Sequence, residues 1–197
     1  QRRILFDTSL RRGRVDGILA IAVAPTESEI DALLDLGLPL VGLGSASPRL
    51  PALRVDDQAV GRVAAEHLLA LGHRHIVHLG DSAPDAGFDV PTQRRRGFEA
   101  AMRDAGIPSP AFVRGEFTVA SGQAAARRLL TAAEPPTAVF AASDEWAFGT
   151  IFAARELGLR VPEDLSVIGV DGHEMGEAFG LTTIDQFPRL QGERAAD

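Results

Sequence analysis

Short apolar runs alternate along the chain with longer segments in which apolar residues recur every three or four positions. A run of four to eight apolar residues is typical of a buried strand, whereas the longer spacing is typical of a helix with one buried face. The segment that begins near residue 58, for example, carries Val60, Ala64 and Leu68 on one stripe. The pattern predicts helices at about 4–12, 27–36, 58–71, 92–105, 119–133 and 145–157, and strands or extended segments at 15–22, 39–43, 53–55, 75–79, 111–114, 137–142, 166–170 and 182–185.

Strands separated by helices predict parallel sheets joined by right-handed crossovers, with helices on both faces. The run SVIGV at 166–170 is nearly all apolar, as expected of a strand buried on both sides, so the fold class expected is α/β. A polar, turn-rich stretch at 52–61 separates two such series. We therefore expect an N-terminal lobe at 1–57, a C-terminal lobe at 58–185 and the start of a return segment at 186–197. The first lobe has too few strands to cover its helices, so we expect it to be incomplete and part of a longer protein.

Composition narrows the class of protein. A chain of 197 residues with 45% hydrophobic content is long enough for one large domain or two lobes of a soluble globular protein. A net charge of −7 argues against nucleic-acid binding by this segment itself, because such binding depends on clustered Lys and Arg. No apolar stretch is long enough to span a membrane. Cysteine is absent, which excludes disulfides and thiolate metal sites and suits a cytoplasmic protein.

Polar and aromatic side chains follow several of the predicted strands. In open parallel sheets, ligands bind beyond the carboxyl ends of the strands. The carboxylate of Asp171 can accept hydrogen bonds from two neighbouring hydroxyls, and the forked guanidinium of Arg94 can donate to them. Rings such as Phe117 and Phe88 can cover the apolar face of a sugar or a base. Together with Ser143, these residues predict a site for a small, hydroxyl-rich molecule.

Each of these residues also has a purely structural interpretation. Asp171 stands before Gly172, a pair that is equally typical of a turn or a helix cap. Arg94 can be one solvated member of the run RRR, and Phe117 can belong to the core. For Asp144 the structural interpretation is favoured, as a cap of the helix that follows it.

No catalytic or metal site stands out from the sequence. The segment HRHIVH at 73–78 resembles a metal-binding cluster, but strand alternation sends His75 and His78 to opposite faces. The run GLGSAS lacks G-x-G-x-x-G spacing, and no serine lies in a G-x-S-x-G motif. We therefore expect a protein that is not an enzyme and that uses neither a metal nor another cofactor.

The predicted helix at 145–157 carries two apolar stripes. One is made of smaller residues, and the other of Phe148, Ile151 and Phe152, which is more apolar surface than a single packed face requires. The second stripe, with Val119, is a candidate dimer interface. The alternative is a helix buried on two sides within one lobe.

Several segments, in this order along the chain, resemble the effector-binding core of LacI/GalR-type transcription regulators. The most specific are EHLLALGHRHI at 66–76 and LGLRVPEDLSVIGVD at 157–171. RVDGILAI, PLVGLG, RRRGFEAAMRDAGI and LTTIDQ add to them, so the resemblance covers nearly the whole chain.

This resemblance implies a two-lobed, periplasmic-binding-protein-like fold that holds an effector between the lobes, and a helix-turn-helix headpiece that precedes this chain. It further implies that Arg94, in the pattern RxxGF, and Asp171, after VIGV, contact the effector, while Ser143 and Phe117 line the same cleft. The chain departs from the family pattern in two places near the site. The usual ND is SD at 143–144, and Gly172 stands where a second acidic residue is common, so the identity of the effector stays open.

The sequence therefore predicts the ligand-sensing domain of a bacterial transcription regulator. We expect a cytoplasmic homodimer that binds a small-molecule effector, a sugar, polyol or nucleoside, and that controls operator DNA through the headpiece. A solute-binding protein of a sugar importer is the alternative, because it shares the lobes and the cleft chemistry; an enzyme acting on a sugar or nucleoside is a more remote one. We also expect that replacing Arg94 or Asp171 by Ala removes effector binding and leaves folding nearly intact.

Overall fold

The computed structural model describes residues 15–21, 25–44, 49–81, 90–107 and 111–196. The chain divides into two compact units, and each is described by itself below. Unit 1 comprises Gln1–Val55 and Pro188–Asp197, and unit 2 comprises Asp56–Phe187.

The chain thus passes between the units twice, from Val55 to Asp56 and from Phe187 to Pro188. We call these junctions the first and second crossovers. The sequence analysis placed them slightly differently, after residue 57 and after residue 185.

Unit 1 is built on a parallel sheet, whose described strands run in the order β1-β2-β3. Ile30 and Leu33 of its first described helix pack with Leu40 and Leu50 in a small core. The elements of unit 1 are β1 (Ile18–Ile21), α2 (Glu27–Asp35), β2 (Leu40–Leu43), β3 (Ala52–Leu53) and α8 (Pro188–Ala196).

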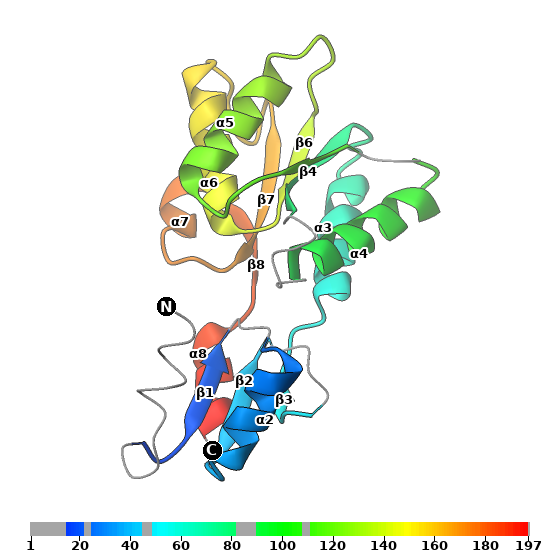
Figure 1. The fold of residues 1–197 in the computed structure, drawn as a ribbon. Coiled ribbons are helices and arrows are strands. Elements are labelled where there is room, and N and C mark those ends of the chain that lie inside the picture. The colour runs from blue at the N-terminus through cyan, green and yellow to red at the C-terminus, as the bar shows by residue number, and fades with distance from the viewer. Residues whose placement is uncertain (1–14, 22–24, 45–48, 82–89, 108–110, 197) are drawn as a thin grey trace. The chain divides into compact units, whose positions relative to one another are not determined.

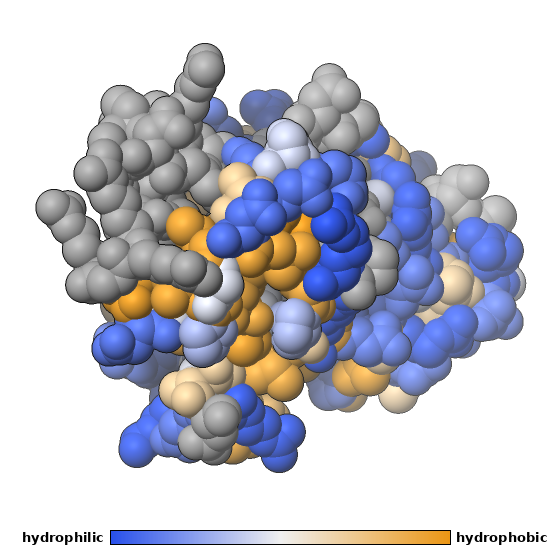
Figure 2. All heavy atoms as spheres, turned by 60° about the horizontal axis from the view of Figure 1, so that its bottom comes forward, coloured by the Kyte–Doolittle hydropathy of each residue, from blue (hydrophilic) through white to orange (hydrophobic). Residues whose placement is uncertain are grey.

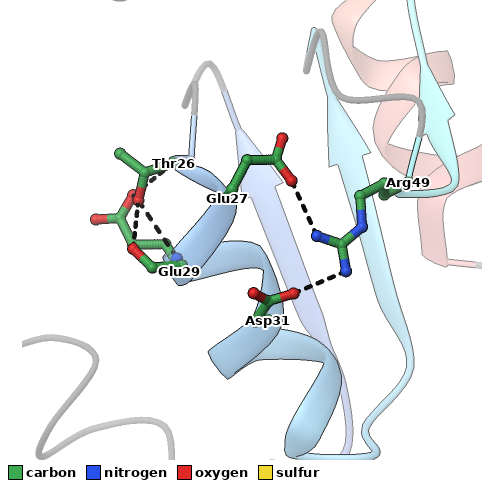
Figure 3. Close-up of polar contacts among 6 residues, drawn as sticks. Thr26, Glu27, Glu29, Asp31 and Arg49 are labelled. Atoms are coloured by element: carbon green, nitrogen blue, oxygen red, sulfur yellow. Dashed lines mark hydrogen bonds and ion pairs between the residues drawn. The ribbon is translucent and has the colours of Figure 1, made fainter.

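Helix α2 begins at a capping box (Figure 3). The Oγ1 atom of Thr26 accepts a hydrogen bond from the N–H of Glu29 at 3.3 Å, and the N–H of Thr26 donates to the Glu29 carboxylate at 2.8 Å. Arg49 then reaches this helix through two ion pairs, to Glu27 at 2.9 Å and to Asp31 at 2.8 Å. All three charged side chains are exposed, so these ion pairs orient the helix more than they stabilise it.

Apolar side chains are exposed on unit 1. In β1, Ile18 and Ala20 pack against the core of the unit, whereas Leu19 and Ile21 alternate with them and are 47% and 60% exposed. Figure 2, in which the bottom of Figure 1 comes forward, shows apolar residues gathered on this unit. Exposed apolar surface of this kind is typical of a contact with further protein.

Unit 2 contains a larger parallel sheet in the order β5-β4-β6-β7-β8. Its central strands β6 and β7 are buried along almost their whole length, which explains why their sequences are apolar rather than alternating. The strands are β4 (Ile76–Asp81), β5 (Phe112–Arg114), β6 (Ala138–Ala141), β7 (Ser166–Asp171) and β8 (Thr182–Asp185).

Two pairs of helices flank this sheet, one pair on each side (Figure 1). The first pair is α3 (Asp57–Ala70) with α4 (Val90–Asp104), and the second is α5 (Val119–Leu130) with α6 (Asp144–Glu156). A short helix, α7 (Gly176–Phe179), follows β7. Trp146 and Ile151 of α6 are fully buried in the core that this helix forms with the sheet.

Helices α3 and α4 meet at two glycines. A Cβ atom on Gly61 would lie 1.8 Å from the carbonyl oxygen of Arg94, and one on Gly97 would lie 1.9 Å from the carbonyl oxygen of Gln58. The two helices therefore touch backbone to backbone, which a larger residue at either position would prevent. This contact fixes the first turns of α4 against the start of α3.

The predicted α/β class, with parallel sheets flanked by helices, is confirmed. The short helices α7 and α8 were not predicted, and the extended segment expected at 53–55 is strand β3 at Ala52–Leu53. The helix predicted at 4–12 lies outside the described residues.

Candidate functional site

The carboxyl ends of β6, β7 and β8 lie on the same side of the sheet, because these three strands are parallel neighbours. The register pairs Phe140 of β6 with Ile168 of β7, and Asp171 of β7 with Asp185 of β8. Ser143 follows β6 by two residues, and Gln186 directly follows β8. Polar side chains from three neighbouring strands therefore gather at one edge of the sheet of unit 2.

Arg94 is a buried residue of α4, with only 4% of its surface exposed. Its Nε–H donates to the carboxylate of Asp57 at 2.9 Å, and its Nη1–H donates to the carbonyl oxygen of Ala142 at 2.5 Å. Asp57 is the first residue of α3, and Ala142 directly follows β6. The guanidinium thus joins the first turn of α3 to the end of the sheet. Arg94 is therefore not a solvated arginine, which was the alternative interpretation of its sequence.

Asp171 ends β7 in an unusual backbone conformation, with a φ of 131°. Its carboxylate accepts a short hydrogen bond from Nε2 of Gln186. Burial raises the pKa of the Asp171 carboxyl to about 6, the nearby Arg94 guanidinium opposes this rise, and the carboxylates of Asp144 and Glu145 add to it. The charge of the Arg94 guanidinium therefore acts on the Asp171 carboxyl, and joint contact of the two side chains with an effector stays a prediction.

Ser143 is the N-cap residue of α6, but its side chain makes no capping hydrogen bond. The residue is 3% exposed, and within the described part of the chain its hydroxyl has no hydrogen-bond partner. A buried hydroxyl without a partner costs free energy unless something else satisfies it. This hydroxyl thus lacks a partner among the described residues, one that a water or a bound molecule would supply.

Asp144 does not cap α6, in contrast to what the sequence analysis favoured. It is the first residue of the helix, and its carboxylate is completely buried. The carboxylate accepts hydrogen bonds from the N–H of His173 at 2.8 Å and from the hydroxyl of Thr183 at 2.7 Å. Burial raises the pKa of the Asp144 carboxyl above its ordinary value, and these two hydrogen bonds offset only part of the rise.

The two predicted aromatic residues have different outcomes. Phe117 lies in the loop after β5 and is 38% exposed, so it is not a core residue. This loop is held by Trp146, whose Nε1–H donates to the carbonyl oxygen of Glu116 at 2.8 Å. Phe88 lies outside the described residues.

The second stripe of α6 packs inside unit 2. Phe148 and Ile151 are 6% and 0% exposed, and Phe152 and Val119 pack against the same core from partly buried positions. The ring of Phe148 lies 5.3 Å from that of Phe179 of α7, and the ring of Phe152 lies 5.6 Å from it. The burial fits the alternative of a helix covered on two sides, and a role of these residues in a dimer stays a prediction.

Two histidines of the HRHIVH segment have partners within the sheet. The ring of His73 bonds to the hydroxyls of Thr137 and Ser166, at 3.0 and 2.9 Å, and burial lowers its pKa. The ring of His78 is fully buried and stacks on Phe140 at 4.6 Å. Within the described residues there is no cluster of metal-ligating side chains, and none of the helices there combines the length and apolarity needed to cross a membrane.

Sequence reasoning missed Asp57, Thr183 and Gln186. Asp57 lies two residues after the first crossover, and Gln186 lies two residues before the second. The segment LTTIDQ, which contains Thr183 and Gln186, was noted for its family resemblance, but that resemblance did not assign these side chains to the site. Their contacts depend on side chains that meet across strands and helices, which no local pattern shows.

Comparison with known proteins identifies the family of the fold. A model of the periplasmic binding protein-like domain matches residues 65–197. The HTH-type transcriptional regulator DegA of Bacillus subtilis is 34% identical over 90% of this chain, and the HTH-type transcriptional repressor PurR of Yersinia pestis is 36% identical over 94% of it. The chain spans only 54% and 56% of those two proteins, about half of their length.

Solved structures give the same result. A LacI family transcriptional regulator from Enterococcus faecium, solved with bound ribose, is 32% identical with a TM-score of 0.86; the match covers 98% of this chain and 73% of that one. A complex of the transcriptional regulator CelR with cellobiose is 29% identical, with a TM-score of 0.83 and coverage of 98% and 61%. A dimeric Lac repressor is 28% identical, with a TM-score of 0.81 and coverage of 93% and 68%.

These relatives are named as regulators of transcription, so they give no support to the alternative of a sugar-importer binding protein. The parallel α/β fold of the chain agrees with theirs over nearly its whole length. The chain belongs to the LacI family of transcription regulators, as part of their periplasmic-binding-protein-like domain.

Proposed function

We propose that this chain is the effector-sensing part of a bacterial LacI-type regulator and that a small, hydroxyl-rich molecule binds at the carboxyl ends of β6, β7 and β8. The observation that carries the proposal is the buried hydroxyl of Ser143, which has no partner among the described residues and lies at the strand ends that also hold Arg94 and Asp171. We propose that the effector is bound and not transformed, because the described residues of the site bring together hydrogen-bonding groups without a nucleophile that a base activates.

The chemistry of the site favours a sugar or a related polyol. The carboxylate of Asp171 accepts from two adjacent hydroxyls, the guanidinium of Arg94 donates to their oxygens, and the hydroxyl of Ser143 does either. Phe117, exposed at the end of the same sheet, offers a ring to the apolar face of the molecule. The structures with ribose and cellobiose belong to relatives that bind such molecules.

The same residues connect the site with the two crossovers. Arg94 pairs with Asp57, next to the first crossover, and Asp171 pairs with Gln186, next to the second. An effector that takes over the Asp171 carboxylate competes with Gln186, and one that draws on Arg94 loosens its hold on Asp57. Effector binding would therefore favour one arrangement of the units over another.

In the whole protein, this preference would reach operator DNA through the headpieces of a cytoplasmic homodimer. Coupling between an effector site and a DNA site is typically about 1–3 kcal/mol, enough to change operator occupancy several-fold or more. The predicted dimer stripe, Phe148, Ile151 and Phe152 with Val119, is our candidate for a subunit contact in that homodimer.

A thermal-shift screen of the full-length protein against sugars, polyols and nucleosides tests the proposal. A molecule that binds only the folded state raises the free energy of unfolding, by about 2.7 kcal/mol at a concentration of one hundred times its Kd. The melting temperature rises as a result. We expect at least one compound to stabilise the wild type and to lose this effect in Asp171→Asn. We expect the same compound to change the affinity for operator DNA in an electrophoretic mobility assay.

Asp164→Asn is the matched control for this screen, because Asp164 lies just before the amino end of β7 whereas Asp171 lies at the carboxyl end of the same strand. This variant should respond to the compound as the wild type does. A compound that stabilises Asp171→Asn as strongly as the wild type, or a panel without any stabilising compound, would contradict the proposal.

A further inference from the structure

The turn after β7 holds an aspartate in a conformation that residues other than glycine rarely adopt. Asp171 has a φ of 131°, and Gly172 after it has a φ of 71°. Glycine tolerates such angles, but an aspartate keeps them only when its surroundings over-determine the turn. The contacts on both sides of this turn therefore show what fixes the direction of the Asp171 side chain.

Both backbone amides that follow Asp171 are bonded to one pair of side chains, the buried Asp144 and the half-buried Thr183. The N–H of His173 donates to one carboxylate oxygen of Asp144 at 2.8 Å. The N–H of Gly172 donates to the hydroxyl of Thr183 at 3.2 Å, and that hydroxyl donates to the other oxygen of Asp144 at 2.7 Å. We call Asp144 and Thr183 the clamp.

The fold makes room for this clamp. A Cβ atom on Gly169 of β7 would lie 2.1 Å from Oδ1 of Asp144, so the carboxylate occupies the space that any other residue at 169 would fill. Asp144 is fully buried, and its helix begins at Ser143 without a side-chain cap. Burying a carboxylate costs free energy unless its oxygens are hydrogen-bonded. Here one oxygen of Asp144 accepts from the turn after Asp171 and the other from Thr183 of β8, and neither caps the helix.

We propose that Asp144 and Thr183 are positioning residues for the effector site, which hold the 171–173 turn so that the Asp171 carboxylate faces the strand-end edge of the sheet. Their importance for effector recognition rests on the function proposed above, whereas the clamp itself does not depend on an effector. Neither residue needs to touch the effector. The clamp holds Asp171 at its unusual backbone angles, and the ordinary angles would turn its carboxylate in another direction.

Thr183→Val and Thr183→Ser form the test, because valine keeps the shape of threonine without its hydroxyl and serine keeps the hydroxyl without the methyl group. In the full-length protein without effector, hydrogen exchange of peptides spanning 171–175 is measured by mass spectrometry. We expect exchange at Gly172 and His173 to become about tenfold faster in Thr183→Val, as expected for the loss of a net hydrogen bond. Thr183→Ser should exchange as the wild type does, and peptides from α3 serve as the internal reference.

The titration of the Asp171 carboxyl is a second readout, and it is read together with the α3 peptides, whose unchanged exchange excludes a general loosening of the fold. Its carbon-13 NMR signal in aspartate-labelled protein is assigned by its absence in Asp171→Asn. It should titrate near pH 6 in the wild type and in Thr183→Ser, and at lower pH in Thr183→Val, because a carboxylate that turns toward water loses the burial that raises its pKa. Arg94, Asp144 and Glu145 are the charged groups that act on this titration, and none of them is altered in this comparison.

If Thr183→Val folds and both readouts match the wild type, the clamp does not position Asp171 and the inference fails. If Thr183→Val does not fold, Asp144→Asn replaces it, since asparagine keeps one acceptor oxygen and loses the other. Unchanged exchange at 171–175 in Asp144→Asn would equally overturn the inference. Because no effector enters these measurements, a failed compound screen and a failed clamp are separate results.

Discussion

Replacing Asp171 by Asn should stabilise the ligand-free protein at neutral pH, although it removes a carboxylate of the proposed effector site. Burial raises the pKa of the Asp171 carboxyl from its ordinary 3.8 to about 6, against the opposing effect of Arg94. Asparagine has nearly the same shape, tolerates a positive φ, and keeps an oxygen for the hydrogen bond from Gln186. The substitution therefore removes mainly the cost of a buried charge.

The direction of the pH dependence follows from the raised pKa. The folded protein holds the Asp171 proton more tightly than the unfolded chain, so this group favours folding most below about pH 4, and the contribution is lost as the pH rises to about 6. Above about pH 6 the folded protein carries the full cost of the charge. The interval from 3.8 to about 6, at about 1.4 kcal/mol per pH unit, sets a ceiling of about 3 kcal/mol. Partial exposure of the carboxylate lowers our expectation to about 1–2 kcal/mol.

Urea unfolding of the full-length protein at pH 7.5 and pH 4.5 measures this effect. Trp146, the only tryptophan of the 197 residues and fully buried in unit 2, serves as the fluorescent reporter. Asp171→Asn should gain stability at pH 7.5 and show less gain at pH 4.5. Asp164→Asn is the opposite control, because Arg160 lowers the pKa of Asp164 to about 2, and this variant should lose stability at pH 7.5. Equal behaviour of Asp171→Asn and the wild type at both pH values would refute the reasoning.

Three further predictions concern Arg94, a pair of glycines and Phe152. Arg94→Ala should lower the free energy of unfolding by about 3–5 kcal/mol in chemical unfolding, because the Asp57 carboxylate, 13% exposed, loses its ion pair with Arg94. This prediction revises the expectation that the variant folds nearly as the wild type does. A loss below about 1 kcal/mol would contradict the revised prediction. Gly97→Ala should lower the free energy of unfolding by about 3 kcal/mol or more, since its Cβ would overlap the backbone of α3. Gly192→Ala, with open space around it in α8, should raise the free energy of unfolding by about 0.5–1 kcal/mol. Similar thermal midpoints for the two variants would argue against the glycine contact between α3 and α4. Phe152→Glu should shift the full-length protein from dimer to monomer in analytical ultracentrifugation if the predicted interface is correct, and an unchanged dimer would exclude this residue from it.

The sequence was most informative where burial on both faces leaves an unambiguous pattern. The runs at 137–142 and 166–170 are apolar except for their first residues, Thr137 and Ser166, and both form inner strands of the sheet of unit 2. Helix α7 has four residues, too few for a helical period to appear. Helix α8, PRLQGERAA, is mostly polar and buries only Ala195 among its residues, so it lacks the apolar stripe on which the prediction depends.

The candidate site was predictable to the extent that it depends on strand ends. Arg94, Ser143 and Asp171 were identified because polar residues after parallel strands meet at one edge of a sheet, and because the chain resembles a known family. The role of Asp144 was not predictable, since an acidic residue at the start of a helix is ordinarily a cap. Only the position of β7, with Gly169 beside it, shows that this carboxylate faces inward.

A crystal structure of the full-length protein with the compound selected by the thermal-shift screen tests the central claim most directly. The account predicts that hydroxyl groups of the compound lie within hydrogen-bonding distance of the Asp171 carboxylate, the Arg94 guanidinium and the Ser143 hydroxyl. A compound bound away from the carboxyl ends of β6, β7 and β8, with the Ser143 hydroxyl still lacking a partner, would contradict it.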